Sequence, residues 1–104
     1  MLAQRLRELE HAKNWEAVVA LEAEACAVAR AVQKAHPDIA CQILNTLGRS
    51  LKNTRKHARG VEVYEEARAL CKAVGDRAGE AEACNGVGIC YYHTKQYARA
   101  AEMH

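Results

Sequence analysis

Asparagine and arginine side chains recur in this chain at fixed spacings. Asn45 and Asn85 lie 40 residues apart, and Arg7 and Arg49 lie 42 residues apart. An asparagine amide both donates and accepts hydrogen bonds, so a ladder of such amides can bind the backbone of an extended peptide. Arginine guanidinium groups favour carboxylates. The pattern favours a peptide-binding surface that prefers acidic ligands; the alternative is that these side chains are solvated groups on helix faces.

Metal binding and catalysis have less support in the sequence. Cys90 and His93 stand three residues apart and could reach one metal ion, but two ligands do not make a site. Cys41, Cys71 and Cys84 are predicted to be small core residues. A nucleophilic cysteine needs a basic partner and an orienting group, and neither can be identified. One serine and two aspartates leave no credible hydrolase triad, so we predict no metal site, no cofactor and no enzyme activity.

A short basic stretch occupies the middle of the chain. It comprises Lys52, Arg55, Lys56, His57 and Arg59. RNA binding is the functional alternative, but no aromatic side chains interleave with these charges, so a solvated turn between helices explains them better. His57 aligns with Tyr97, forty residues later, which predicts a packing role for the imidazole.

The 40-residue spacing extends over a whole segment. Residues 41–64 laid over residues 81–104 give six identities in 24 pairs. The identical pairs are Asn45/Asn85, Gly48/Gly88, Thr54/Thr94, Ala58/Ala98, Arg59/Arg99 and Glu62/Glu102. The start of the chain joins the series at an offset of 42 residues, where Leu9 falls on Leu51. A period of this size indicates stacked repeats, so we predict one array of units 1–36, 37–75 and 76–104, the last of them truncated.

Composition indicates a nearly all-helical protein of one small domain. The 104 residues include a single proline and no phenylalanine, and alanine and glutamate are common. A net charge of +2 gives no strong attraction to nucleic acid or membrane. The apolar run at residues 17–21, which no other run exceeds, is far too short to span a membrane, and residues 1–11 lack the apolar stretch of a signal peptide. An odd number of cysteines without such a signal leads us to expect reduced thiols in the cytoplasm.

Apolar spacing and turn residues predict six helices in three antiparallel pairs. Their approximate ranges are 2–11, 15–35, 37–52, 55–74, 77–93 and 96–104. Asn14 and Asp76 are suited to cap helix N-termini, Pro37 to a first helical turn and Gly75 to a helix end. The predicted buried stripe of the fourth helix is Val61, Tyr64, Ala67, Leu70 and Val74. Because the last pair shows no polar cap, we expect a fragment of a longer array; the alternative is an exposed last pair.

The recurring residues resemble tetratricopeptide repeats. Leu47-Gly48, Leu51, Gly60, Tyr64 and Ala67 carry the pattern, and Val87-Gly88, Tyr91, Tyr97 and Ala100 repeat it. Residues 36–45 are similar to the 42-residue repeats of kinesin light chains, and residues 75–92 to the 40-residue repeats of G-protein-signalling modulators. The resemblance implies an all-α superhelix of antiparallel helix pairs, about two and a half to three repeats long. Gly48 and Gly88 would let the paired helices approach closely.

In such arrays the first helix of each pair lines a concave groove that binds a peptide or helix of a partner protein. The groove residues implied here are Arg7, Gln42, Asn45, Arg49, Lys52, Asn85, Ile89, Tyr92 and His93. We therefore predict an adaptor or scaffold whose ligand is a protein segment of acidic character, with no nucleic acid and no membrane insertion. The structural alternative is self-association, in which the exposed last helix pair extends the array between chains.

Overall fold

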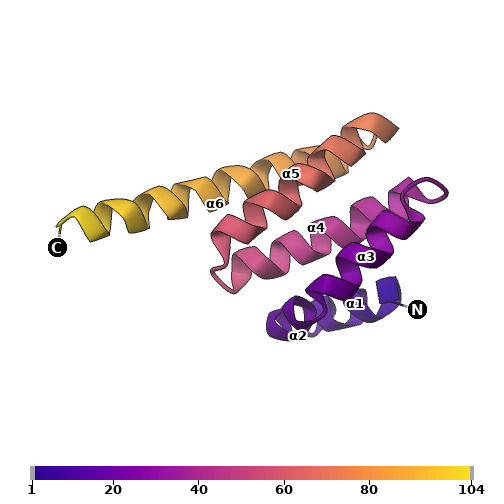
Figure 1. Ribbon diagram of the computed structural model, residues 1–104, viewed down its shortest axis with the longest axis horizontal. Helices are drawn as coiled ribbons and strands as arrows, with labels where there is room; N and C mark the ends of the chain where they lie inside the picture. Colours follow the sequence, from indigo (N-terminus) through magenta and orange to yellow (C-terminus); the bar gives the residue numbers. More distant parts are fainter. Residues whose placement is uncertain (1, 104) are drawn as a thin grey trace.

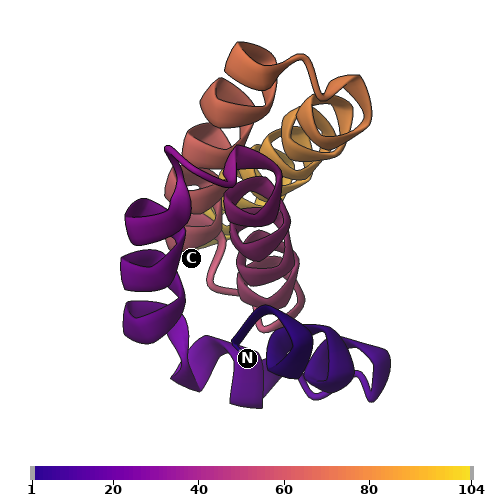
Figure 2. The same ribbon diagram turned by 90° about the vertical axis from the view of Figure 1, so that its right-hand side faces the viewer.

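Residues 2–103 form six helices, which stack in two layers. The computed structural model describes the backbone of residues 2–103 and the side chains of residues 2–95. The helices are α1 (Leu2–His11), α2 (Trp15–Ala20), α3 (Glu22–Val32), α4 (Pro37–Asn53), α5 (His57–Val74) and α6 (Arg77–Met103). The end-on view of Figure 2 shows α1, α4 and α6 in one layer and α2, α3 and α5 in the other. This arrangement, with no strand among residues 2–103, confirms the prediction of an all-α superhelix.

Three of the helices end in the same way. Lys13, Arg55 and Gly75 each adopt a left-handed backbone, with φ of 56°, 65° and 78°. After Gly75, the N–H of Asp76 donates to the carbonyl of Cys71 at 2.9 Å, which closes the turn as a Schellman motif. A left-handed conformation costs a residue other than glycine about 1–2 kcal/mol, so packing of the following helix must offset this cost at Lys13 and Arg55.

Helix starts follow the predicted capping residues. The side-chain oxygen of Asn14 accepts a hydrogen bond from the backbone N–H of Ala17 at 3.3 Å, and that of Asp76 accepts from Gly79 at 3.0 Å. Pro37 is the first residue of α4. These caps satisfy backbone donors that have no partner within their own helix.

The centre of the core is the ring of Tyr64, which is fully buried. A Cβ atom built at Gly48 of α4 would lie 2.9 Å from this ring, and one at Gly86 of α6 would lie 2.4 Å from it. The missing side chains therefore let α4 and α6 close on the ring from α5. The buried residues of α5 are His57, Gly60, Val63, Tyr64, Ala67 and Cys71. The predicted stripe was thus only partly right, because Val61 and Leu70 are half-buried and Val74 is exposed.

The predicted second helix, residues 15–35, is broken in the structure. Leu21 separates α2 from α3 with φ of −97° and ψ of 13°, and α3 ends at Val32. The bend lets α2 contact both α1 and α4 while α3 packs along α4. Val18 on one side of the bend and Ala25 and Ala29 on the other are all buried as a result.

The predicted turn between the fifth and sixth helices is absent. A single helix, α6, runs through from Arg77 to Met103, antiparallel to α5, and extends past the start of α5 (Figure 1). A turn would need Lys95 in the costly left-handed conformation, whereas the following sequence is rich in alanine and other strong helix formers. Gly88 consequently faces open space and brings no helices together. The expectations for Tyr97 and Ala100 concern side chains outside the described residues.

Candidate functional site

Two ion pairs that share Arg49 cross one of the two helix layers. Helices α1, α4 and α6 lie side by side in this layer, and each contributes a residue. Arg49 of α4 forms ion pairs with Glu10 of α1 and with Glu82 of α6. The third guanidinium nitrogen of Arg49, Nη2, donates to the hydroxyl of Thr46 at 3.3 Å. The guanidinium is therefore satisfied within the protein, and the two carboxylates around it would repel an acidic ligand, so the predicted role of Arg49 does not fit this geometry.

Asn45 also differs from its predicted place in the groove. It is only 5% exposed, and its amide nitrogen donates to the backbone carbonyl of Gly79 at 3.3 Å. Asn45 thus joins α4 to α6. The sequence analysis had predicted that this amide contacts a ligand instead. Asn85 is exposed, so the two amides do not form an accessible ladder.

Two of the predicted residues meet between α1 and α4. Arg7 and Gln42 are exposed and border a hollow whose floor includes Leu6, Ile43 and Thr46. Its volume of about 10 Å³ is room for about one water molecule. This hollow is too small to hold a peptide side chain.

A larger hollow lies where α4 ends and α6 passes over the following turn. It has a volume of about 290 Å³ and is lined by Lys52, Asn53, Arg55, His57 and His93, and we refer to it as the basic hollow. The imidazole rings of His57 and His93 stack, with centroids 4.8 Å apart and planes 12° from parallel. Burial, followed by the charges of His93 and Arg55, lowers the pKa of His57. Four basic side chains from α4, its turn, α5 and α6 therefore converge.

The helix dipole adds to this positive field. α5 begins at His57, has no acidic residue in its first turn and has no side-chain cap on its N-terminus. Unsatisfied N–H groups give the start of a helix a partial positive charge that favours anions. The basic hollow is thus a place where a carboxylate would be stabilised.

Comparison with known proteins assigns the family. Residues 39–104, from α4 to the end of the chain, match the tetratricopeptide repeat family model. The chain belongs to the tetratricopeptide repeat family. No curated protein and no solved structure matches it. Tetratricopeptide repeats are in general protein–protein interaction modules, which agrees with the predicted class of function.

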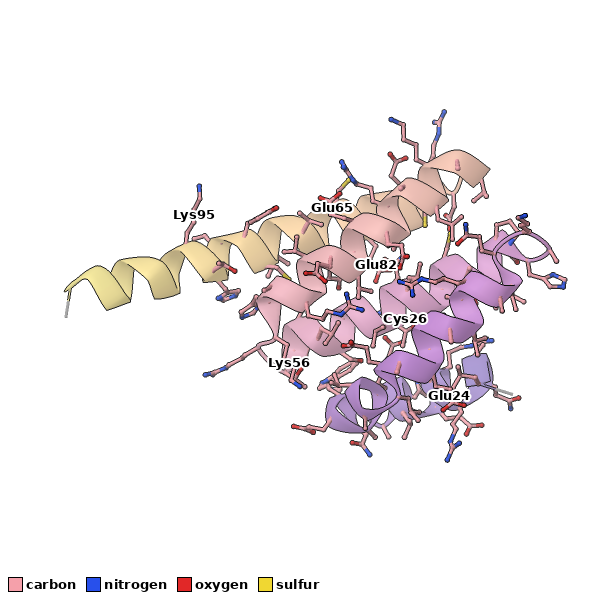
Figure 3. All side chains as sticks on the ribbon, viewed as in Figure 1. Glu24, Cys26, Lys56, Glu65, Glu82 and Lys95 are labelled. Carbon is pink, nitrogen blue, oxygen red and sulfur yellow. The ribbon has the colours of Figure 1, made fainter. Side chains whose placement is uncertain are left out.

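The basic stretch of this tetratricopeptide array divides between two faces. Lys52, Arg55 and His57 border the basic hollow, whereas Lys56 borders a separate hollow with Glu16 and Val19 of α2. Figure 3 shows Lys56 pointing outward from the turn between α4 and α5. The sequence analysis interpreted this basic stretch as a solvated turn. It did not predict that α6 would place His93 opposite Lys52, Arg55 and His57. No local pattern signals this contact, which depends on the crossing of α4 and α6.

The outer face of α6 carries the remaining groove candidates. Asn85 and Tyr92 are exposed, Tyr92 to 61%, and Ile89 is half-buried. Spacings of three and four residues place them on one side of the helix, next to His93. The tetratricopeptide array therefore presents an amide, an aliphatic group and an aromatic ring in line with the basic hollow.

Four of the five cysteine thiols of the array are buried. Cys26, Cys41, Cys71 and Cys90 are buried, while Cys84, which was predicted to be in the core, is exposed. Burial raises the pKa of all four buried thiols, that of Cys71 to about 12. A raised pKa lowers the fraction of reactive thiolate.

Among residues 2–103, no helix is both long and apolar enough to cross a membrane.

Proposed function

We propose that this array binds an acidic segment of a partner protein and that the basic hollow receives a carboxylate of that segment. The observation that carries the proposal is the convergence of Lys52, Arg55 and His93 around a cavity with no acidic side chain among its described lining residues. Neither Lys52 nor Arg55 forms an ion pair with any side chain of residues 2–95. Their charges remain available to a ligand.

The contrast with Arg49 defines the specificity of the site. Arg49 lies on α4 between α1 and α6 but is already neutralised by Glu10 and Glu82. A carboxylate is therefore attracted to the basic hollow and repelled from the middle of the layer. A hydrogen bond to a charged group contributes about 1.5–3 kcal/mol, so one carboxylate in the hollow fixes the register of the ligand.

The rest of the ligand would lie along α6. Tyr92 and Ile89 offer apolar area next to the hollow, and the amide of Asn85 can pair with the backbone of a peptide. A suitable ligand has an acidic residue, or a C-terminal carboxylate, with apolar side chains next to it in sequence.

Affinity capture from a cell extract, quantified by mass spectrometry, tests this function. The baits are the native chain, a Lys52→Glu/Arg55→Glu variant and a Lys34→Glu/Lys56→Glu variant of equal net charge, all checked for equal helicity. Lys34 and Lys56 are exposed basic residues outside the basic hollow. We expect partners that are lost with the first variant and retained with the second. Equal retention by both variants would remove the basic hollow as the binding site.

Self-association through α6 is the second candidate. The exposed faces of Tyr91 and Tyr92 and the length of α6 beyond α5 favour it. Gly48 on α4 is covered by Tyr64, whereas its equivalent Gly88 on α6 is open. Sedimentation over a wide concentration range tests this function: a rising mass that Tyr92→Glu reverses supports it, and a monomer at high concentration excludes it.

A further inference from the structure

Two sulfur atoms and a carboxylate meet where α4, α5 and α6 come together. Cys41 lies in the second turn of α4, Cys71 near the end of α5 and Asp76 directly before α6. Their ligand atoms lie within 4.8 Å of one another. Both cysteines are buried and Asp76 is half-buried. Within residues 2–95, no other three His, Cys, Asp or Glu side chains converge as closely.

The backbone holds Cys71 and Asp76 in a fixed relation. The N–H of Asp76 donates to the carbonyl of Cys71, and Gly75 between them is left-handed. One carboxylate oxygen of Asp76, Oδ1, accepts a hydrogen bond from the N–H of Gly79 at 3.0 Å. That cap leaves Oδ2 available to the cluster.

Gly79 forms the floor of the cluster. A Cβ atom at this position would lie 2.6 Å from Oδ2 of Asp76 and 2.7 Å from Sγ of Cys71. Any side chain at residue 79 would therefore occupy the space on which these two atoms converge. The carbonyl of Gly79 is in turn fixed by the amide of Asn45, so the floor is anchored to α4.

We propose that Cys41, Cys71 and Asp76 bind a zinc ion at this junction. Zinc takes thiolate and carboxylate ligands in tetrahedral geometry, and three protein ligands leave one position for water. Zinc–sulfur bonds of about 2.3 Å place two sulfur ligands about 3.8 Å apart, which requires a contraction of about 1 Å at most from the spacing in this structure.

Binding displaces two protons. Each thiol loses its proton to solvent as its sulfur bonds to the ion, and the carboxylate binds as it stands, so one Zn²⁺ replaces two H⁺. The carboxylates of Asp38 and Glu80 also act on the two thiols, beside that of Asp76. The same acidic charges favour a cation once it enters.

A bound ion would stabilise the array. It would link the turn before α6 directly to α4 and α5, and no such site exists in the unfolded chain, so metal binding and folding are coupled. This inference is independent of peptide binding in the basic hollow.

Titration of the reduced native chain with Zn²⁺ and with Cd²⁺ tests the site. We expect one ion per chain, two protons released per ion in buffers of different ionisation heat, a cadmium–thiolate absorption band and a higher unfolding temperature. Cys71→Ser should abolish the band. Asp76→Asn keeps an oxygen for the Gly79 cap. Loss of an outer-shell partner of a metal ligand lowers metal affinity by roughly 10- to 100-fold, and loss of the Asp76 carboxylate as a direct ligand should lower zinc affinity by at least as much.

Two cysteines outside the cluster provide matched controls. Cys26 is buried and Cys84 is exposed, and neither lies in the cluster. Cys26→Ser and Cys84→Ser should each leave the stoichiometry and the band unchanged. Binding that survives Cys71→Ser, disappears with Cys84→Ser or is absent from the native chain would overturn the assignment. If circular dichroism shows that Cys71→Ser is unfolded, Asp76→Asn decides the question. An unchanged zinc affinity of Asp76→Asn would also overturn the assignment.

Discussion

Two glycines in α6, two residues apart, give a sharp test of how this helix packs. Alanine is favoured over glycine within a helix by about 1 kcal/mol, and this gain is common to Gly86→Ala and Gly88→Ala. At residue 88 the new methyl group meets no atom within 4 Å, so the gain should appear in full. At residue 86 it would stand 2.4 Å from the ring of Tyr64, whereas carbon atoms prefer separations of about 3.5–4.0 Å.

Such overpacking costs about 1–3 kcal/mol in a closed core. Gly88→Ala should therefore raise the free energy of unfolding by about 1 kcal/mol. The free energy of unfolding of Gly86→Ala should lie about 1–3 kcal/mol below that of Gly88→Ala. Each kcal/mol shifts the unfolding temperature of a domain of this size by about 4–8 °C. Urea denaturation followed by circular dichroism, supported by thermal scans, measures the difference.

Equal stability of the two variants would refute the packing of α6 on Tyr64 through Gly86. The reverse order, with Gly88→Ala the less stable, would indicate that α6 turns back near Thr94 and that a following helix covers Gly88, as the repeat pattern had predicted. The native chain serves as the common reference.

Three further predictions concern the core, the histidine pair and the thiols. Leu47 is fully buried, so Leu47→Ala should cost roughly 2–5 kcal/mol, and a loss well under about 1 kcal/mol in urea denaturation would mean that the wrong face of α4 has been placed inside. Because the folded-state pKa of His57 is lowered, the unfolded chain binds more protons, so stability should fall as the pH drops below about 6.5 and level off below the folded-state pKa. His57→Asn should flatten that pH dependence, and an unchanged slope would contradict it. A mild alkylating reagent should modify Cys84 rapidly and the four buried cysteines slowly, and mass spectrometry that finds a buried cysteine labelled first would contradict the packing.

Sequence analysis could predict the helices because their ends carry local chemistry. Asn14, Pro37, Gly75 and Asp76 act through their own backbone neighbours, so their effect needs no knowledge of the fold. The break at Leu21 has no such signal, because it is set by the two directions in which α2 and α3 must run to pack. Around Thr94 the sequence pattern predicts a turn that the structure does not have. Thr54 and Thr94 make the same hydrogen bond to the carbonyl four residues earlier, yet only the first is followed by a turn.

The candidate site was less predictable than the fold. A period of 40 residues identifies equivalent positions but not equivalent surroundings. Asn45 is covered by α6, while Asn85 has no helix over it. The partners of Arg49, Glu10 and Glu82, are each more than 30 residues away in sequence. The convergence of Lys52, Arg55 and His93 likewise arises only from the crossing of helices.

The most direct test of the central claim is a nuclear magnetic resonance titration of the isotope-labelled chain with a short glutamate-rich peptide. A lysine-rich peptide of the same length and apolar content is the control. We predict shifts of the backbone amide signals of residues 52–57 and 93 with the acidic peptide alone, and their loss in Lys52→Glu/Arg55→Glu but not in Lys34→Glu/Lys56→Glu. Shifts centred on Arg49, or equal shifts with both peptides, would contradict the account.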